Sequence, residues 1–194
     1  MAADLVRRGV AVIATAGSTP ALMAARAETA TTPIVFATGG DPVQLGLVAS
    51  LSRPGGNLTG ASSLNTLSTA KRLGLMRELV PQATRFFTLV NPASALTAPS
   101  LKDLQEGAGS IGLTLEVLRA SNDAEIEAAF AGLPPPPGRV LVFPPDTFFF
   151  NRRERIAALA IQHRLPTVFD VREYVDSGGL MSYGTDFLKA MTVA

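Results

Sequence analysis

Small polar residues and glycines cluster where apolar segments end, and these clusters are the part of the sequence best suited to chemistry. They are Thr15-Ala16-Gly17-Ser18-Thr19, Thr38-Gly39-Gly40-Asp41, Asn91-Pro92-Ala93-Ser94, Asp146-Thr147, Phe169-Asp170 and Ser182-Tyr183-Gly184. The free N–H groups at the start of a helix, with hydroxyl or carboxylate groups beside them, bind carboxylates and other small polar groups. One such cluster alone indicates an ordinary helix cap. The full set, converging on one edge of a sheet, indicates a ligand-binding cleft.

We therefore predict a cleft lined by residues at or just beyond the carboxyl ends of strands. The predicted ligand-binding residues are Ser18, Thr19, Thr38, Asp41, Asn91, Asp146, Phe169, Ser182 and Tyr183. We expect Asp41 or Asp146 to accept charge-assisted hydrogen bonds from an amino group of the ligand.

Catalytic and metal chemistry have little support in the composition. The 194 residues include no cysteine and one histidine, His163, which excludes thiolate nucleophiles, cysteine-ligated zinc and any site with two imidazoles. His163 lies where a helix is predicted to end, and a cationic group there interacts favourably with the terminal carbonyl groups. No GxSxG elbow surrounds a serine. We predict no enzyme activity, no catalytic residue, no metal and no cofactor.

The run Gly107-Ala108-Gly109-Ser110-Ile111-Gly112 matches the dinucleotide-binding pattern GxGxxG letter for letter. That chemistry needs a strand, then the glycines, then the N-terminus of a helix facing the pyrophosphate. Here the glycines follow a predicted helix and precede a predicted strand, so the order is reversed. The run is therefore interpreted as a glycine-rich helix end.

The overall composition describes a globular protein without a nucleic-acid partner. Hydrophobic residues make up 47% and charged residues 17%, enough apolar surface to require a core. Seventeen basic and sixteen acidic residues leave a net charge of +1, and neither sign forms a run.

Short β-branched or aromatic runs alternate with segments of helical character along the chain. Predicted strands cover residues 10–14, 33–37, 86–90, 113–118 and 140–143, and predicted helices cover 20–29, 42–51, 99–111, 123–130 and 148–162. This alternation is typical of an α/β fold with a parallel sheet. Several strands are apolar at successive positions, as expected where helices flank both faces.

Breaker residues mark a boundary within the first third of the chain. Arg53-Pro54-Gly55-Gly56-Asn57 precedes an extended segment over 58–64, where we expect a boundary between two lobes. Residues 2–8 and 186–191 both have helical character and look like interrupted elements. We therefore expect the sequence to be a fragment that lacks both ends.

Several motifs closely resemble those of ABC-transporter substrate-binding proteins, a family with tryptophan- and tyrosine-binding members. They are Pro33-Ile34-Val35-Phe36-Ala37, Asp41-Pro42-Val43, Gly46 through Gly60, Lys71-Arg72-Leu73, Leu79-Val80-Pro81, Val90-Asn91-Pro92, Arg172-Glu173-Tyr174 and Gly178 through Gly184. The resemblance implies a two-lobed, type I periplasmic-binding fold in which parallel sheets are flanked by helices. It further implies a first lobe at 1–61 that is truncated here, a second lobe at 62–179, and a crossing strand with the start of a return helix at 180–194.

The truncation makes a specific prediction about burial. Residues on the first lobe's sheet should be more exposed than their counterparts on the second: Val10, Val12, Ile34 and Phe36, against Leu89, Leu141 and Phe143.

The function implied by the resemblance is capture of a small solute, such as an amino acid, by hinge closure of two lobes. The partners implied are the solute, a membrane permease and its ATPase, and the location implied is periplasmic or membrane-anchored and extracytoplasmic. One alternative is the ligand-sensing core of a transcription regulator, which needs a helix-turn-helix that this sequence does not show. Another is a small α/β enzyme.

Overall fold

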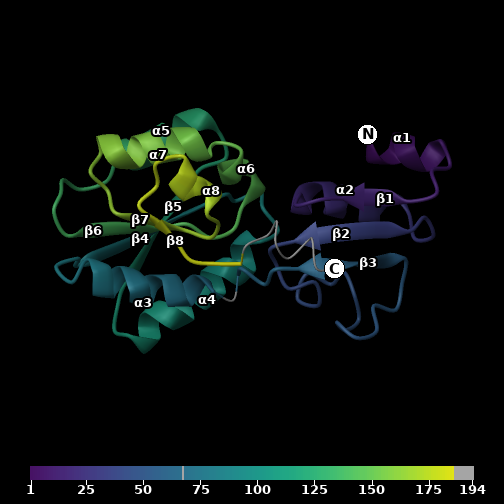
Figure 1. The fold of residues 1–194 in the computed structure, drawn as a ribbon, viewed down its shortest axis with the longest axis horizontal. Coiled ribbons are helices and arrows are strands. Elements are labelled where there is room, and N and C mark those ends of the chain that lie inside the picture. Colours follow the sequence, from purple (N-terminus) through teal and green to yellow (C-terminus); the bar gives the residue numbers. More distant parts are fainter. Residues whose placement is uncertain (67, 186–194) are drawn as a thin grey trace. The chain divides into compact units, whose positions relative to one another are not determined.

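The computed structural model describes residues 1–66 and 68–185, which form two compact units. The first unit is Met1–Leu64 and the second begins at Asn65. Each unit has its own parallel sheet, coloured purple to blue in the first and teal to yellow in the second (Figure 1).

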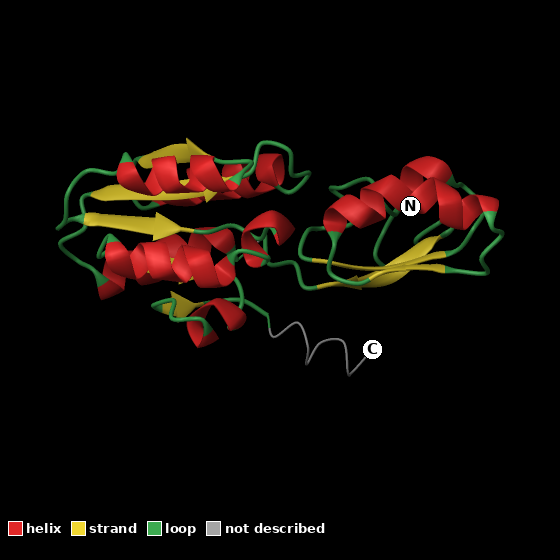
Figure 2. Cartoon of the chain, turned by 90° about the horizontal axis from the view of Figure 1, so that it is seen from above, coloured by secondary structure: helices red, strands yellow, loops and turns green. Residues whose placement is uncertain are grey.

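The first unit is a three-stranded sheet with helices on one face. Its elements are α1 (Ala2–Arg7), β1 (Ile13–Thr15), α2 (Thr19–Glu28), β2 (Ile34–Thr38) and β3 (Leu58–Ser62), with strand order β1-β2-β3. Both strand pairs are parallel. In their register, Ile13 lies opposite Ile34, and Ile34 lies opposite Leu58. Figure 2 shows the helices of this N-terminal unit on one side of its sheet. Leu22 and Ala25 of α2 pack there against the sheet.

Burial in this sheet corrects one expectation. Ile34 and Phe36 are only 0% and 4% exposed, as buried as the strand residues of the second unit, because their side chains face α2. The prediction that they would be more exposed is wrong. Val12 is 51% exposed and Val10 is half-buried, as expected. Val35 is 45% exposed because successive strand residues point to opposite faces.

The second unit is a five-stranded sheet with helices on both faces. Its strands are β4 (Arg85–Val90), β5 (Leu115–Arg119), β6 (Arg139–Val142), β7 (Thr167–Phe169) and β8 (Met181–Ser182), in the order β5-β4-β6-β7-β8. Its helices are α3 (Thr69–Leu79), α4 (Thr97–Ser110), α5 (Asp123–Ala131), α6 (Thr147–Phe150), α7 (Arg153–Gln162) and α8 (Glu173–Asp176). Every strand pair in it is parallel.

Helices on both faces explain the unbroken apolar sequence of the central strands. Phe86 and Val140 pack with α3 and α4, whereas Phe87 and Leu141 pack with α5 and α7. These two pairs of helices lie on opposite faces of the sheet (Figure 1). Each of these four residues is at most 2% exposed. A half-exposed sheet would instead alternate apolar and polar residues.

Side-chain caps fix the starts of three helices. Ser18 Oγ accepts from Ala21 N at 3.3 Å before α2, and Asn122 Oδ1 accepts from Glu125 N at 3.0 Å before α5. Asp146 Oδ1 accepts from Phe148 N and Phe149 N before α6. Across residues 1–66 and 68–185, no helix has both the length and the apolar character needed to cross a bilayer.

Two predicted helices differ from the structure, and one lies outside the described residues. Residues 42–51 form turns rather than a helix, because Gly46 has a φ of +65° and Leu47 N donates back to Pro42 O. The helix predicted over 148–162 divides into α6 and α7, with the break at Asn151 and Arg152. The helix predicted over 186–191 lies beyond the part that the structure describes.

The glycine-rich run of the sequence serves helix packing. Gly107 and Gly109 both lie within α4, whose last residue is Ser110. A Cβ atom built on Gly107 would lie 2.4 Å from the Cβ of Ala70 on α3, whereas a Cβ on Gly109 would meet nothing within 4 Å. The missing side chain at position 107 therefore lets α3 and α4 approach closely.

This difference predicts opposite effects for two equivalent substitutions. Gly107→Ala should lower the free energy of unfolding by about 1–3 kcal/mol, because the added methyl overpacks the helix contact. Gly109→Ala should leave it unchanged or raise it by up to about 1 kcal/mol, because alanine is the better helix former. Urea denaturation of both variants checks this, and equal effects would contradict the packing role of Gly107.

Candidate functional site

The residues predicted to bind a ligand all lie at or shortly after the carboxyl end of a described strand. Because each sheet is parallel, they gather on one edge of their own sheet. The first unit contributes Ser18, Thr19, Thr38 and Asp41 to its carboxyl edge, and the second contributes Asn91, Asp146, Phe169, Ser182 and Tyr183.

A hydroxyl network joins the carboxyl ends of the first unit's strands. The hydroxyl groups of Thr19 and Thr38 are hydrogen-bonded at 3.0 Å, and both residues are buried. Gly40 N donates to Thr38 Oγ1 at 3.2 Å, and Ser62 Oγ donates to Gly40 O at 2.6 Å. The network thus spans the residues that follow or end β1, β2 and β3, and it fixes the loop that contains Gly40.

Asp41 and Ser18 shape this edge by binding backbone N–H groups. Asp41 Oδ1 accepts from Val43 N at 2.8 Å and from Gln44 N at 3.3 Å. Within the described residues, its second oxygen, Oδ2, has no hydrogen-bond donor. The aspartate therefore holds its loop with one oxygen and keeps an acceptor for another group.

Asp146 has the same arrangement on the second unit. Its Oδ1 accepts from Phe148 N at 2.8 Å and Phe149 N at 3.1 Å, whereas Oδ2 has no donor in residues 1–66 and 68–185. Asn91 also binds its own turn, since its Oδ1 accepts from Ala93 N at 3.0 Å. Asp146 therefore caps α6 with one carboxylate oxygen and keeps the other available as an acceptor.

The ring of Phe169 belongs to the core of the second unit. It is fully buried, stacks on Tyr174 with ring centroids 4.2 Å apart, and lies 5.0 Å from Phe143. Burial raises the pKa of the Tyr174 hydroxyl well above its ordinary value. Phe169 thus supports the carboxyl edge from within, and its carbonyl accepts a hydrogen bond from Tyr183 N at 2.9 Å.

Two basic residues of α3 hold Tyr183. Arg72 Nη1 donates to Tyr183 O at 2.8 Å, and Lys71 Nζ lies 5.0 Å from the centre of the Tyr183 ring. Interaction with the Tyr183 side chain raises the pKa of Lys71. Lys71 and Arg72 are part of the Lys-Arg-Leu motif found in the sequence.

Sequence reasoning missed two buried charged residues at this edge, Arg72 and Asp170. Arg72 is 0% exposed, and desolvation lowers its pKa to about 10, opposed by the charge of Asp170. Asp170 directly follows β7 and is 8% exposed. Desolvation raises the pKa of its carboxyl group, Arg72 opposes that rise, and the charges of Glu173 and Asp146 add to it. Asp146 and Asp170 follow the carboxyl ends of two neighbouring strands, β6 and β7.

Two patterns in the sequence could have identified Arg72 and Asp170. Thr69, Arg72, Leu73 and Met76 are the buried positions of α3, and their spacing places the arginine on the apolar stripe of the helix. A charged residue on such a stripe is paired when it is buried. Asp170 follows its strand as Asp146 follows β6, and it stands in one of the polar clusters of the sequence.

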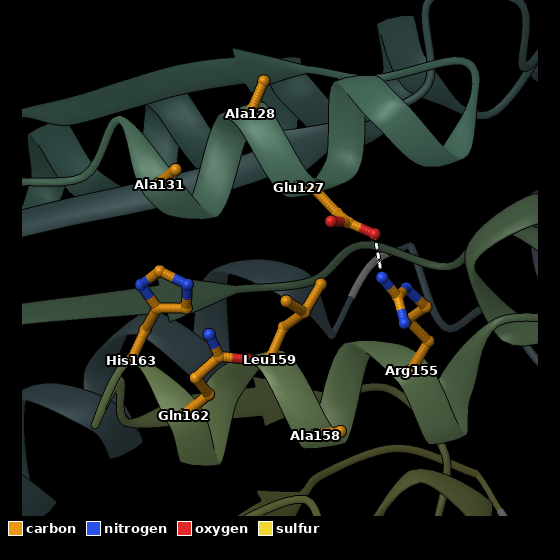
Figure 3. Close-up of a pocket in the computed structure, with 8 residues that line it drawn as sticks. All are labelled: Glu127, Ala128, Ala131, Arg155, Ala158, Leu159, Gln162 and His163. Carbon is orange, nitrogen blue, oxygen red and sulfur yellow. Dashed lines mark hydrogen bonds and ion pairs between the residues drawn. The ribbon is translucent and has the colours of Figure 1, made fainter.

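A groove of about 420 Å³ lies elsewhere on the second unit, between α5 and α7 (Figure 3). Glu127 and Arg155 form an ion pair across it, and His163 and Gln162 line one end. None of the nine predicted binding residues lines this groove. Among the described residues there is no group of three or more His, Cys, Asp or Glu side chains that could hold a metal ion.

His163 has a structural position at the end of α7. It is the C-cap residue, its ring lies 5.9 Å from the ring of Phe130, and its carbonyl accepts from Arg139 Nη2 at 2.6 Å. These contacts are on the helix-to-strand side of the unit, away from the carboxyl edge.

Comparison with known proteins identifies the family. Residues 1–191 match the family model described as ABC transporter substrate binding protein. A tyrosine-binding protein of Clostridioides difficile (strain R20291) is 29% identical over 174 residues, which are 89% of this chain and 49% of that protein. The chain thus spans about half the length of this relative.

Two solved structures share the fold. A conserved domain protein from Vibrio cholerae O1 biovar eltor str. N16961 has a TM-score of 0.85 and 26% identity, and the alignment covers 97% of this chain and 62% of that one. An ABC domain in complex with L-Trp from Streptococcus pneumonia has a TM-score of 0.83 and 21% identity, over 100% and 66% of the two chains.

The fold expected from the sequence is confirmed by these similarities: parallel sheets flanked by helices in the type I periplasmic-binding arrangement. Because the family model matches nearly the whole sequence, this chain belongs to the ABC transporter substrate-binding protein family.

Proposed function

We propose that this chain belongs to the solute-binding component of an ABC transporter and that its small solute is an amino acid. In this proposal it acts outside the cytoplasm and delivers the solute to a membrane permease with its ATPase. The protein binds and releases its solute without chemical conversion. Family membership supports the transport role, and the name of the tyrosine-binding relative makes L-tyrosine the first solute to examine.

The observation that carries the proposal is the gathering of polar groups at the carboxyl edges of the two sheets. In open α/β sheets, ligands bind outside the carboxyl ends of the strands. We propose Ser18, Thr19, Thr38, Asp41, Asn91, Asp146, Phe169, Ser182 and Tyr183 as the residues that form or support the solute site.

An amino acid offers an ammonium and a carboxylate, and the carboxyl edge of each sheet has a group for the ammonium. Oδ2 of Asp41 and Oδ2 of Asp146 are carboxylate oxygens on loops that their partner oxygens already hold. A fixed loop reduces the entropy lost on binding, so a charge-assisted hydrogen bond retains more of its strength.

Calorimetric titration of the protein with L-tyrosine tests the proposed solute class. We expect a saturable signal with one site per chain for L-tyrosine or for the related L-tryptophan, and a weaker signal for D-tyrosine. The stereochemical control is needed because a merely hydrophobic surface would bind both enantiomers alike. Absence of saturable binding for both L-amino acids would contradict the proposed solute.

The role of Asp146 is tested by Asp146→Asn, since the amide keeps an oxygen that can cap α6 but lacks the charge. Affinity for the bound amino acid should fall by about tenfold or more, the factor expected for a lost hydrogen bond to a charged group. Asp4→Asn, on the exposed surface of α1, is the matched control and should bind as the unchanged protein does. Equal affinities in the two variants would remove Asp146 from the site.

A further inference from the structure

Arg72 holds three acceptors from a fully buried position. Its Nη1 donates to Tyr183 O at 2.8 Å, and its Nη2 donates to Asn65 O at 3.2 Å and to Thr69 Oγ1 at 2.8 Å. Thr69 lies one turn earlier on the same helix. Asn65 and Tyr183, in contrast, are 118 positions apart in the sequence, since 183 minus 65 is 118. The guanidinium group thus joins two distant segments of the second unit.

The two segments are also bonded to each other. Thr185 N donates to Asn65 Oδ1 at 2.9 Å, so the side chain of Asn65 binds one segment while its carbonyl binds Arg72. Asn65 is the first residue of the second unit, and Tyr183 directly follows β8. Arg72 and Asn65 together therefore fasten the entry of the chain into this unit to the segment that leaves its last described strand.

We infer that Arg72 is a hinge-positioning residue, whose guanidinium group fixes the entry segment at Asn65 and the exit segment at Tyr183 to α3 and thereby restricts where the chain can bend. This inference rests on the proposed function to the extent that solute capture uses hinge closure.

The junction itself concentrates the bend in few bonds. Leu64, the last residue of the first unit, has a φ of +50°, which is a left-handed conformation that a bulky side chain rarely adopts. Leu64 N donates to Ser62 Oγ at 3.1 Å, within the first unit, whereas Asn65 is held by Arg72 within the second. Because each neighbour is bonded within its own unit, we expect a change of the angle between the units to occur in the backbone that joins Leu64 to Asn65. Hinges of this kind absorb a motion in a few dihedral angles.

Close packing at Gly184 restricts the exit segment as well. A Cβ atom at position 184 would lie 2.0 Å from Asp170 O and 3.2 Å from Asn65 Oδ1. Only a glycine lets this segment approach both groups. The same segment carries Tyr183, whose ring lies beside Lys71.

The arginine cannot be replaced by another cation without loss of these contacts. Its planar group donates from Nη1 to one acceptor and from Nη2 to two, and the charge of Asp170 partly offsets the cost of burying it. Lysine would keep the charge but present a single nitrogen, which cannot donate to Asn65, Thr69 and Tyr183 in the same geometry. Arg72→Lys is therefore the conservative variant that separates geometry from charge.

The test compares Arg72→Lys with Arg77→Lys, the same change on the same helix. Arg77 is exposed and donates to Ile111 O, so it touches neither segment. Because the sequence has no cysteine, thiols introduced at exposed Glu28 and Gln105 provide one spin label on each unit. Pulsed electron resonance then measures the distribution of distances between the labels in the absence of any amino acid, and hydrogen exchange measures the amides of Tyr183 and Thr185.

In Arg72→Lys we expect a broader distance distribution and about tenfold faster exchange at Tyr183 and Thr185, with the amides of β4 unchanged. Arg77→Lys should match the unchanged protein in both measurements. A distance distribution that stays narrow in Arg72→Lys would overturn the inference even where exchange increases, since Arg72 would then stabilise the unit without restricting the hinge. Equal broadening in both variants would overturn it too.

Gly184→Ala keeps the inference testable if Arg72→Lys does not fold, because it displaces the exit segment while leaving the arginine in place. It should broaden the same distribution, and an unchanged distribution would again overturn the inference. These measurements need no solute. Failure of the titration with L-tyrosine and L-tryptophan would therefore count against the proposed solute alone, and a narrow distribution would count against the hinge role alone.

Discussion

Parallel pairing of every described strand is the constraint on which the rest of this structure depends. A parallel strand can be reached only by a crossover that returns the chain to the same end of the sheet, and such a crossover is usually a helix. That requirement explains the covered faces of the second unit and the long apolar runs of β4 and β6. It also brings the carboxyl ends of the strands in each sheet to one edge of that sheet, where several threonines, aspartates and glycines lie.

The fold class followed from the sequence because it depends on patterns that any parallel sheet must show. Apolar runs such as 140–143, followed by a helix that Asp146 caps, leave few other architectures. Capping follows ordinary residue preferences: Ser18 and Asn122 are of the types that favour N-cap positions, and they accept hydrogen bonds at the starts of α2 and α5. The carboxyl-edge residues could be selected for the same reason, since their position in the chain determines their position in the sheet.

Other features depend on which partner a residue meets, and a single sequence does not contain that information. The segment over 42–51 has the composition of a helix, but the left-handed Gly46 and the hydrogen bond from Leu47 N to Pro42 O turn it back. Phe169 follows the pattern of an edge residue, yet stacking on Tyr174 places its ring in the core. The contacts of Arg72 were not predicted, because Tyr183, one of its acceptors, lies 111 positions away in the sequence.

The close approach of α3 and α4 couples the substitutions that are possible at two positions distant in the sequence. Ala70 and Gly107 share a space that holds one methyl group, so the chain can place that methyl on either helix but not on both. A descendant of this sequence with alanine at 107 would first need glycine at 70, and the reverse order would pass through an overpacked intermediate. Substitutions at positions 70 and 107 should therefore occur as a pair, and the methyl group should be lost at one position before it is gained at the other.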